Sequence, residues 1–151
     1  MKIRLAAYPP GVHRIIEQID AADLALDPAV FSNPIYADLL LDRHDPYLQF
    51  TFDLQTAVRL ECDRCLTGYD FALKVNSPMM YVLGRTSGNQ DVDDPEIVYI
   101  PMGTTDLDIS TDLRDFLILA VPEKKLCRED CRGICLRCGA ELNVVSCSCG
   151  G

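Results

Sequence analysis

Four close pairs of cysteines constrain this chain more than any other feature of its sequence. The spacings within the pairs are C-x2-C, C-x3-C, C-x2-C and C-x-C. The pairs are Cys62 and Cys65, Cys127 and Cys131, Cys135 and Cys138, and Cys147 and Cys149. A tetrahedral zinc site takes two such pairs, because each short loop brings two thiolates to one ion with little strain. The pattern therefore predicts bound metal with a structural role, as one or two zinc ions.

The eight cysteines divide most simply into two sets of four. Loop closure favours neighbouring pairs, which predicts one site made of Cys135, Cys138, Cys147 and Cys149. The second site is then made of Cys62, Cys65, Cys127 and Cys131. This second site would staple the C-terminal segment to a distant part of the chain and stabilise the fold through metal binding. Other partitions of the four pairs remain open.

Two other kinds of cysteine chemistry compete with zinc. A C-x2-C pair is also the redox motif of thioredoxin-like proteins, but that motif needs a helix N-terminus to lower the thiol pKa. The pair Cys62 and Cys65 follows a predicted strand instead. An iron–sulfur cluster also takes four cysteines, but the spacings match neither common ferredoxin pattern. Both alternatives rank below zinc.

Composition and charge place the chain among acidic globular proteins. Hydrophobic residues make up 48% of the 151 residues, which is enough for a core. No apolar run is long enough for a transmembrane helix, and the N-terminus lacks a secretory signal, so we expect a cytoplasmic protein. Cysteines stay reduced in that compartment, which favours metal over disulfides. The net charge of −9 counts against binding of duplex nucleic acid.

Alternating hydrophobicity predicts a strand meander in the middle of the chain. Apolar residues recur at every second position over 35–41, 48–62 and 69–75, as expected for strands with one buried face. The turns between these segments fall at 42–46 and at the first cysteine pair. Shorter strands are predicted at 2–8, 79–83 and 97–100, and an acidic loop at 84–96. A strand is also favoured at 13–19, although the apolar residues over 12–19 fit a helical stripe as well. The fold class is therefore α+β, mostly β, with an antiparallel strand meander.

One helix is predicted near 109–121, ahead of the cysteine-rich segment. Leu113, Phe116, Leu117 and Ala120 recur at helical spacing, and Asp108 is the predicted N-cap. The domain organisation follows as a β-rich body over 1–121 with this helix, and a small zinc-knuckle tail over 122–151 docked on the body.

The basic residues of the tail are the candidate partner contacts. Residues 1–121 hold nine basic and nineteen acidic side chains, whereas residues 122–151 hold five basic and four acidic ones. The five basic residues are Lys124, Lys125, Arg128, Arg132 and Arg137. They are candidates for contact with RNA or a protein partner, although a solvated surface explains them equally well.

The sequence carries no pattern typical of an enzyme. It has no nucleophile elbow, phosphate-binding loop or dinucleotide fingerprint. Four cysteines per metal ion leave no open position for a catalytic water. The two histidines, His13 and His44, are isolated and are predicted to be surface residues. We therefore predict a protein that is not an enzyme and has no catalytic residues.

The order of these motifs resembles the YceD family of large ribosomal RNA subunit accumulation proteins. The resemblance covers roughly residues 40–150 and rests on C-D-R-C-L at 62–66, the helix before Pro122, and C-R-E-D-C-R-G-I-C at 127–135. It implies a cytosolic role in accumulation of 23S rRNA and assembly of the large ribosomal subunit. The residues carried over are the cysteine pairs and Arg64. Leu136 departs from the proline that relatives often have, which makes that turn less rigid.

Two functions of different classes follow. The first is a non-enzymatic, zinc-binding factor that contacts large-subunit precursor rRNA or a basic ribosomal protein, with no membrane partner. In this function the tail would contact RNA and the acidic body would suit a basic protein. The second is a redox or iron–sulfur protein that uses the paired cysteines and is unrelated to RNA. A scaffold that zinc merely holds together is compatible with the first.

Overall fold

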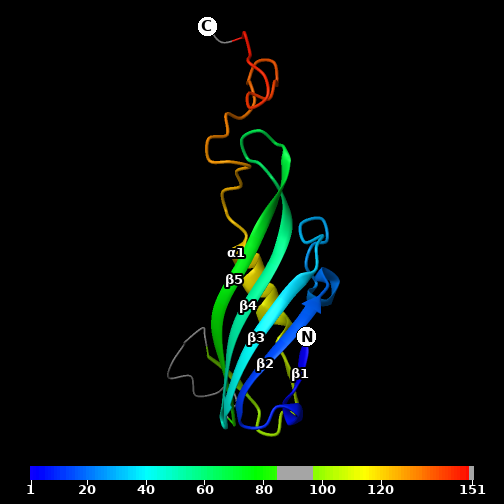
Figure 1. Ribbon diagram of the computed structural model, residues 1–151, viewed down its shortest axis with the longest axis vertical. Helices are drawn as coiled ribbons and strands as arrows, with labels where there is room; N and C mark the ends of the chain where they lie inside the picture. Colours follow the sequence, from blue (N-terminus) through cyan, green and yellow to red (C-terminus); the bar gives the residue numbers. More distant parts are fainter. Residues whose placement is uncertain (85–96, 150–151) are drawn as a thin grey trace.

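The computed structural model describes residues 1–84 and 97–149, and its main element is a five-stranded sheet (Figure 1). The strands stand in the order β2-β3-β4-β5-β6. Their bounds are β2 Gly11–Ile19, β3 Ile35–His44, β4 Tyr47–Glu61, β5 Gly68–Leu83 and β6 Ile97–Ile100. The first four strands pair antiparallel, and β6 runs parallel to β5. The predicted class, mostly β with an antiparallel meander and one C-terminal helix, is confirmed.

Strands β4 and β5 form a hairpin that is longer than the rest of the sheet. Strand β3 pairs with β4 only from Tyr47 to Gln55, whereas β5 follows β4 as far as Glu61. The part of β4 beyond Gln55 therefore extends about 20 Å past the end of β3, and its amide at Arg59 donates to the carbonyl of Val30 in the loop before β3 at 2.8 Å. Its tip carries the loop with Cys62 and Cys65. In Figure 1 the C-terminal segment, in orange and red, passes this tip.

A second layer covers one face of the sheet. It consists of α1 (Ser110–Ala120), the paired strands β1 (Lys2–Arg4) and β7 (Asp106–Asp108), and the 3-10 helices η1 (Leu5–Ala7) and η2 (Ala21–Leu24). In Figure 1, α1 and β1 lie behind the strands of the large sheet. None of the described helices is long and apolar enough to cross a membrane.

Alternation along β4 sets the buried face. Leu48, Phe50, Phe52 and Leu54 are completely buried, and the residues between them are more exposed. The ring of Phe52 lies 5.5 Å from that of Phe116 on α1, measured between centroids. Burial of a large apolar side chain contributes about 1.5–3 kcal/mol, so these contacts hold the helix on the sheet.

The helix begins slightly later than predicted. The N-cap position is Ile109, which offers no side-chain acceptor. The carboxylate of Asp108, one residue earlier, accepts hydrogen bonds from the hydroxyl (2.6 Å) and the amide (3.0 Å) of Ser110, which lower the pKa of Asp108. The helix ends at Ala120, ahead of Pro122. The prediction of Asp108 as the N-cap is therefore wrong by one residue, although its carboxylate accepts hydrogen bonds from the first residue of the helix.

Three boundaries of the predicted strands are wrong. The strand expected at 2–8 ends at Arg4, because the chain turns into η1. The turn expected at 42–46 shrinks to Asp45 and Pro46, because ladder pairing continues to His44 and Tyr47. The segment 79–83 is the end of β5 and not a separate strand, since pairing with β4 continues through Pro78. Residues 85–96 of the predicted acidic loop lie outside the described residues.

Candidate metal centres

The first candidate metal centre lies between the tip of the β4–β5 hairpin and the C-terminal segment. The sulfurs of Cys62, Cys65, Cys127 and Cys131 all lie within 4.8 Å of one another. The Sγ atoms of Cys62 and Cys131 are 3.7 Å apart, as are those of Cys65 and Cys127. Four sulfurs around a tetrahedral zinc ion lie about 3.8 Å apart. All four members are thiols and three are buried, so the donor set fits one metal ion.

The second candidate centre lies entirely within the C-terminal segment. Its members are Cys135, Cys138, Cys147 and Cys149, again within 4.8 Å of one another. The sulfur of Cys147 lies 3.4 Å from that of Cys138 and 3.3 Å from that of Cys135. Cys138 is exposed and the other three are half-buried. The structure thus brings together the same two sets of cysteines that loop closure favoured, in two different environments.

The C-x2-C loops of the two centres share one backbone arrangement. In each loop the amide of the first cysteine donates to the carbonyl five residues further on, at 3.0 Å from Cys62 and 2.8 Å from Cys135. The residue after the second cysteine, Leu66 or Gly139, donates back to the first cysteine's carbonyl at 2.8 Å. Its φ is positive in both loops, 59° at Leu66 and 73° at Gly139. Gly139 adopts this conformation easily, whereas Leu66 does so at a cost of roughly 1 kcal/mol.

Hydrogen bonds and burial shift the pKa values of the thiols in the first centre in opposite directions. Burial opposes ionisation of Cys62, but the backbone amides of Cys127, Cys65 and Arg64 lower the pKa of its thiol to about 6. Burial and the neighbouring sulfurs, Cys65 first among them, raise the pKa of Cys127 to about 12. The four thiols therefore do not all ionise near neutral pH by themselves. A divalent cation between them would stabilise the fully ionised set.

The second centre shows the same division. The amides of Cys138 and Arg137 lower the pKa of the Cys135 thiol to about 6. The amide of Cys149 acts in the same direction on Cys147, but the sulfurs of Cys135, Cys138 and Cys149 outweigh it and raise the pKa of Cys147 to about 12. This set also needs a cation before all its sulfurs carry charge.

Backbone contacts fasten the C-terminal segment to the hairpin tip beside the first centre. The amide of Asp63 donates to the carbonyl of Lys125 at 2.8 Å, and the amide of Lys125 donates to the Asp63 carboxylate at 2.7 Å. Arg64 donates to the carbonyl of Cys131 at 2.8 Å. Gly133 has φ of 77°, and a Cβ added there would lie 3.0 Å from the carbonyl oxygen of Arg64. The hairpin tip and the segment are therefore in close backbone contact.

Asn143, which lies in sequence between the two cysteine pairs of the second centre, contacts the first centre and was not among the predicted site residues. Its side-chain amide donates to the sulfur of Cys131 at 3.3 Å, and its side-chain oxygen accepts from Arg128 and from the amide of Arg132, both at 2.8 Å. Its amide is the largest cause that lowers the pKa of the Cys131 thiol. No spacing rule singles out an asparagine between two cysteine pairs, so the sequence offered no signal for this role.

The five basic residues of the tail fall into two groups. Arg128 is bound to Asn143 and paired with Asp130, and Arg137 donates to the carbonyl of Cys149 at 2.7 Å. The side chains of Lys124, Lys125 and Arg132 make no ion pair with the described residues. Lys124 and Arg132 are also exposed, and so these two are the better placed to meet a partner.

The histidines contribute to neither centre. Nε2 of His13 lies 2.6 Å from the carbonyl oxygen of Pro9. Nδ1 of His44 lies 2.7 Å from the carboxylate of Asp42, and the side chain of His44 is exposed. Among the described residues, both four-residue groups that can hold a metal ion consist of cysteines alone.

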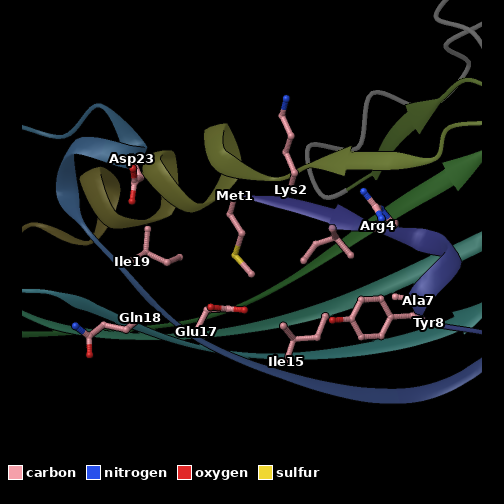
Figure 2. Close-up of a pocket in the computed structure, with 11 residues that line it drawn as sticks. Met1, Lys2, Arg4, Ala7, Tyr8, Ile15, Glu17, Gln18, Ile19 and Asp23 are labelled. Atoms are coloured by element: carbon pink, nitrogen blue, oxygen red, sulfur yellow. The ribbon is translucent and has the colours of Figure 1, made fainter.

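A cavity of about 550 Å³ that the sequence did not predict lies between β1 and β2 (Figure 2). Ile15 and Ile19 of β2 form part of its lining. Figure 2 shows Lys2 and Arg4 pointing away from β2, while Glu17 points toward β1. Glu17 is exposed although it occupies an inward-facing position on β2. Because β2 is an edge strand, an inward charge there disfavours pairing with a further strand.

The fold and the two thiol centres define a sheet protein with two candidate metal sites of four cysteines each. Residues 50–151 match the family model described as large ribosomal RNA subunit accumulation protein YceD. The matched range includes all eight cysteines. The chain belongs to the YceD family. No solved structure was found to match the chain.

Two plant relatives carry the same family name. The chain is 30% identical to the chloroplastic YCED homolog 1 of Arabidopsis thaliana over 141 residues, which covers 78% of this chain and 44% of the relative. It is 38% identical to the chloroplastic homolog 1 of Zea mays over 63 residues, or 41% of this chain and 22% of the relative. An uncharacterised protein of Mycobacterium leprae is 29% identical over 84 residues, 38% of its length. The chain thus spans less than half the length of these relatives.

Proposed function

We propose that this chain is a non-enzymatic, zinc-binding factor that supports accumulation of 23S rRNA and assembly of the large ribosomal subunit. The observation that carries the proposal is the family match over residues 50–151, a range that contains both candidate centres. The plant relatives are named for accumulation of the large ribosomal RNA subunit. The cytoplasm remains the proposed location, as expected from the sequence.

Zinc in these centres would be structural. Each centre offers four thiolates, which fill a tetrahedral zinc ion and leave no position for water or substrate. Sulfur separations of 3.3–3.7 Å suit a single ion. An iron–sulfur cluster would hold the cysteine sulfurs further apart, because several irons and sulfides lie between them. These points favour zinc over the iron–sulfur alternative.

In the proposed factor, the first centre would hold the tail in a fixed position on the body. It would fix the tail, with Lys124, Lys125 and Arg132, at the tip of the projecting hairpin. Basic side chains held on a rigid support are suited to phosphate groups of precursor rRNA. The acidic body, remote from this tip, suits a basic ribosomal protein. The tail and the body are thus the two proposed contact regions.

The experiment that tests this function is complementation in cells that lack the chain. We expect loss of 23S rRNA on deletion and rescue by the wild type. A variant with Lys124, Lys125, Arg128, Arg132 and Arg137 changed to Ala should rescue poorly. Full rescue by this variant would show that the basic residues of the tail are not needed for the function. An unchanged level of 23S rRNA after deletion would contradict the proposed function itself.

Metal analysis separates the proposal from the redox or iron–sulfur alternative. After anaerobic purification we expect a colourless protein that holds tightly bound zinc. Visible absorbance with bound iron, or reversible loss of thiols under mild oxidant without zinc, would favour the alternative.

A further inference from the structure

The uncovered face of the large sheet combines apolar and acidic side chains at its centre. Alternation sends Ile16 of β2 and Tyr36 and Leu40 of β3 to the face opposite α1. They are 68%, 56% and 44% exposed, so this face keeps large apolar surface in water. In Figure 1 no described element crosses the strands on the side away from α1. An uncovered apolar face of this kind is typical of a contact surface.

Two carboxylates face each other in the middle of this surface. Asp38 of β3 and Asp53 of β4 are direct partners in the strand register. Like charges directly opposite each other destabilise a sheet, so this pairing has a cost that the fold itself does not explain. Arg14 of β2 donates to both oxygens of Asp38, at 2.8 and 2.5 Å. No cation pairs with Asp53 among the described residues, and its carboxylate accepts a hydrogen bond from the side-chain amide of Gln55 at 3.0 Å.

Shallow hollows connect these groups along the strands. One, of about 310 Å³, is lined by Leu40 and Asp53, and the next, of about 160 Å³, by Ile16, Asp53 and Tyr36. A third, of about 350 Å³, lies beyond Tyr36 and is lined by the cation Lys74, so it does not belong to the acidic surface. The first two hollows form a trough that follows β3 from Leu40 to Tyr36 for about 13 Å, the length of roughly four residues of extended chain.

We propose that this trough docks a basic, extended segment of a partner protein, with a Lys or Arg side chain paired to Asp53 and apolar side chains over Ile16, Tyr36 and Leu40. Charge complementarity selects this occupant. The trough offers an acid without a paired cation on a body of net charge −10 over residues 1–121. An RNA strand would bring its phosphates against Asp38 and Asp53. The inference rests on the proposed function, since it names the kind of partner that an assembly factor would hold here.

Binding of designed peptides to the full zinc-loaded chain tests the surface. The probe is a fluorescein-labelled peptide of about ten residues that alternates Lys and Val. A matched Glu–Val peptide and a single-stranded RNA of similar length are the comparison ligands. Anisotropy at physiological salt should show that the Lys–Val peptide binds the chain, whereas the Glu–Val peptide and the RNA do not. Binding of the RNA without the basic peptide overturns the proposal, as does self-association of the chain through this face in light scattering.

Variants with matched controls locate the contact. Asp53→Lys should weaken binding of the Lys–Val peptide on the order of tenfold. Asp115→Lys, on the exposed surface of α1, makes the same charge change on the opposite layer and should have less than about a twofold effect. Ile16→Thr should weaken binding roughly fivefold, whereas Leu119→Thr, at an 82% exposed position of α1, should not. Equal effects of either variant and its control overturn the proposal.

Complementation distinguishes this inference from the proposed function. If deletion leaves 23S rRNA unchanged, the proposed function is contradicted. The peptide titration still tests whether the sheet surface binds a basic segment. If deletion lowers 23S rRNA, Asp53→Lys should rescue poorly and Asp115→Lys fully. Full rescue by Asp53→Lys overturns the docking surface and leaves the proposed function intact. Unchanged melting temperature and zinc content show that each variant is folded.

Discussion

The two candidate metal centres have the same ligands but different places in the fold. The first joins the hairpin tip at Cys62 to the segment at Cys131, and both of these residues are buried. The second joins residues of one short segment, and its Cys138 is exposed. A cross-link between distant parts of a chain constrains the unfolded state more than a local one does. The comparison therefore predicts a global role for the first centre and a local role for the second.

The largest expected effect is on the melting temperature when one cysteine ligand of a centre is replaced. Cys62→Ser should release the tail from the hairpin and lower the melting temperature on the order of 10 °C, because metal binding there stabilises long-range structure. Cys147→Ser should lower it by no more than about 3 °C. Differential scanning calorimetry gives both values. Equal global unfolding in both variants would contradict the difference between the centres.

Metal removal should occur in two steps. The exposed second centre should lose its ion first to a chelator, and the buried first centre should lose its ion later. A colorimetric zinc indicator would show a fast and a slow phase of equal size in the wild type. In Cys147→Ser the fast phase of zinc release should be absent, and the slow phase should remain. A single phase in the wild type would mean that the centres are coupled or equally accessible.

Removal of the Asn143 side chain should weaken metal binding at the first centre. In Asn143→Ala the amide that lowers the pKa of Cys131 is lost, so the pKa of this thiol rises. Metal binding needs the thiolate, so protons compete better and the pH at half loading moves upward. We expect zinc affinity at the first centre to fall roughly tenfold. Asn33→Ala, which removes an amide hydrogen bond to Ala57 elsewhere, is the control and should leave the titration unchanged.

A pair of glycine substitutions should have the smallest effect and separate crowding from backbone strain. Gly133 and Gly139 have φ of 77° and 73°, so Ala is strained at both. Only at Gly133 does the new Cβ meet backbone, the Arg64 carbonyl oxygen at 3.0 Å. Gly133→Ala should therefore weaken docking of the tail by about 1 kcal/mol more than Gly139→Ala. Hydrogen exchange of the Asp63 and Lys125 amides measures this, and equal protection in both variants would contradict it.

Local patterns predicted the hairpin and the grouping of the cysteines well. Alternation over 48–62 gave the buried face of β4, because each strand residue reports which side of the sheet it occupies. Loop closure favoured the same sets of cysteines that the structure brings together, since short-range pairing needs only sequence distance.

Long-range pairing could not be predicted in the same way. Nothing near Ile3 indicates that β1 pairs with β7 at Leu107, and nothing in 97–100 indicates that β6 runs parallel to β5. Alternation places Asp38 and Asp53 on the outer face, but their direct opposition depends on register, which the turn sets. Asn143 contacts Cys131 through the path of the tail, which a single sequence does not encode in a readable pattern.

The most direct test of the account is a count of zinc ions by native mass spectrometry. The central claim is that two separate sets of four cysteines each hold one ion. We predict two zinc ions in the wild type, one in Cys62→Ser and one in Cys147→Ser. Two ions retained in either variant, or a single ion in the wild type that both substitutions remove, would contradict it.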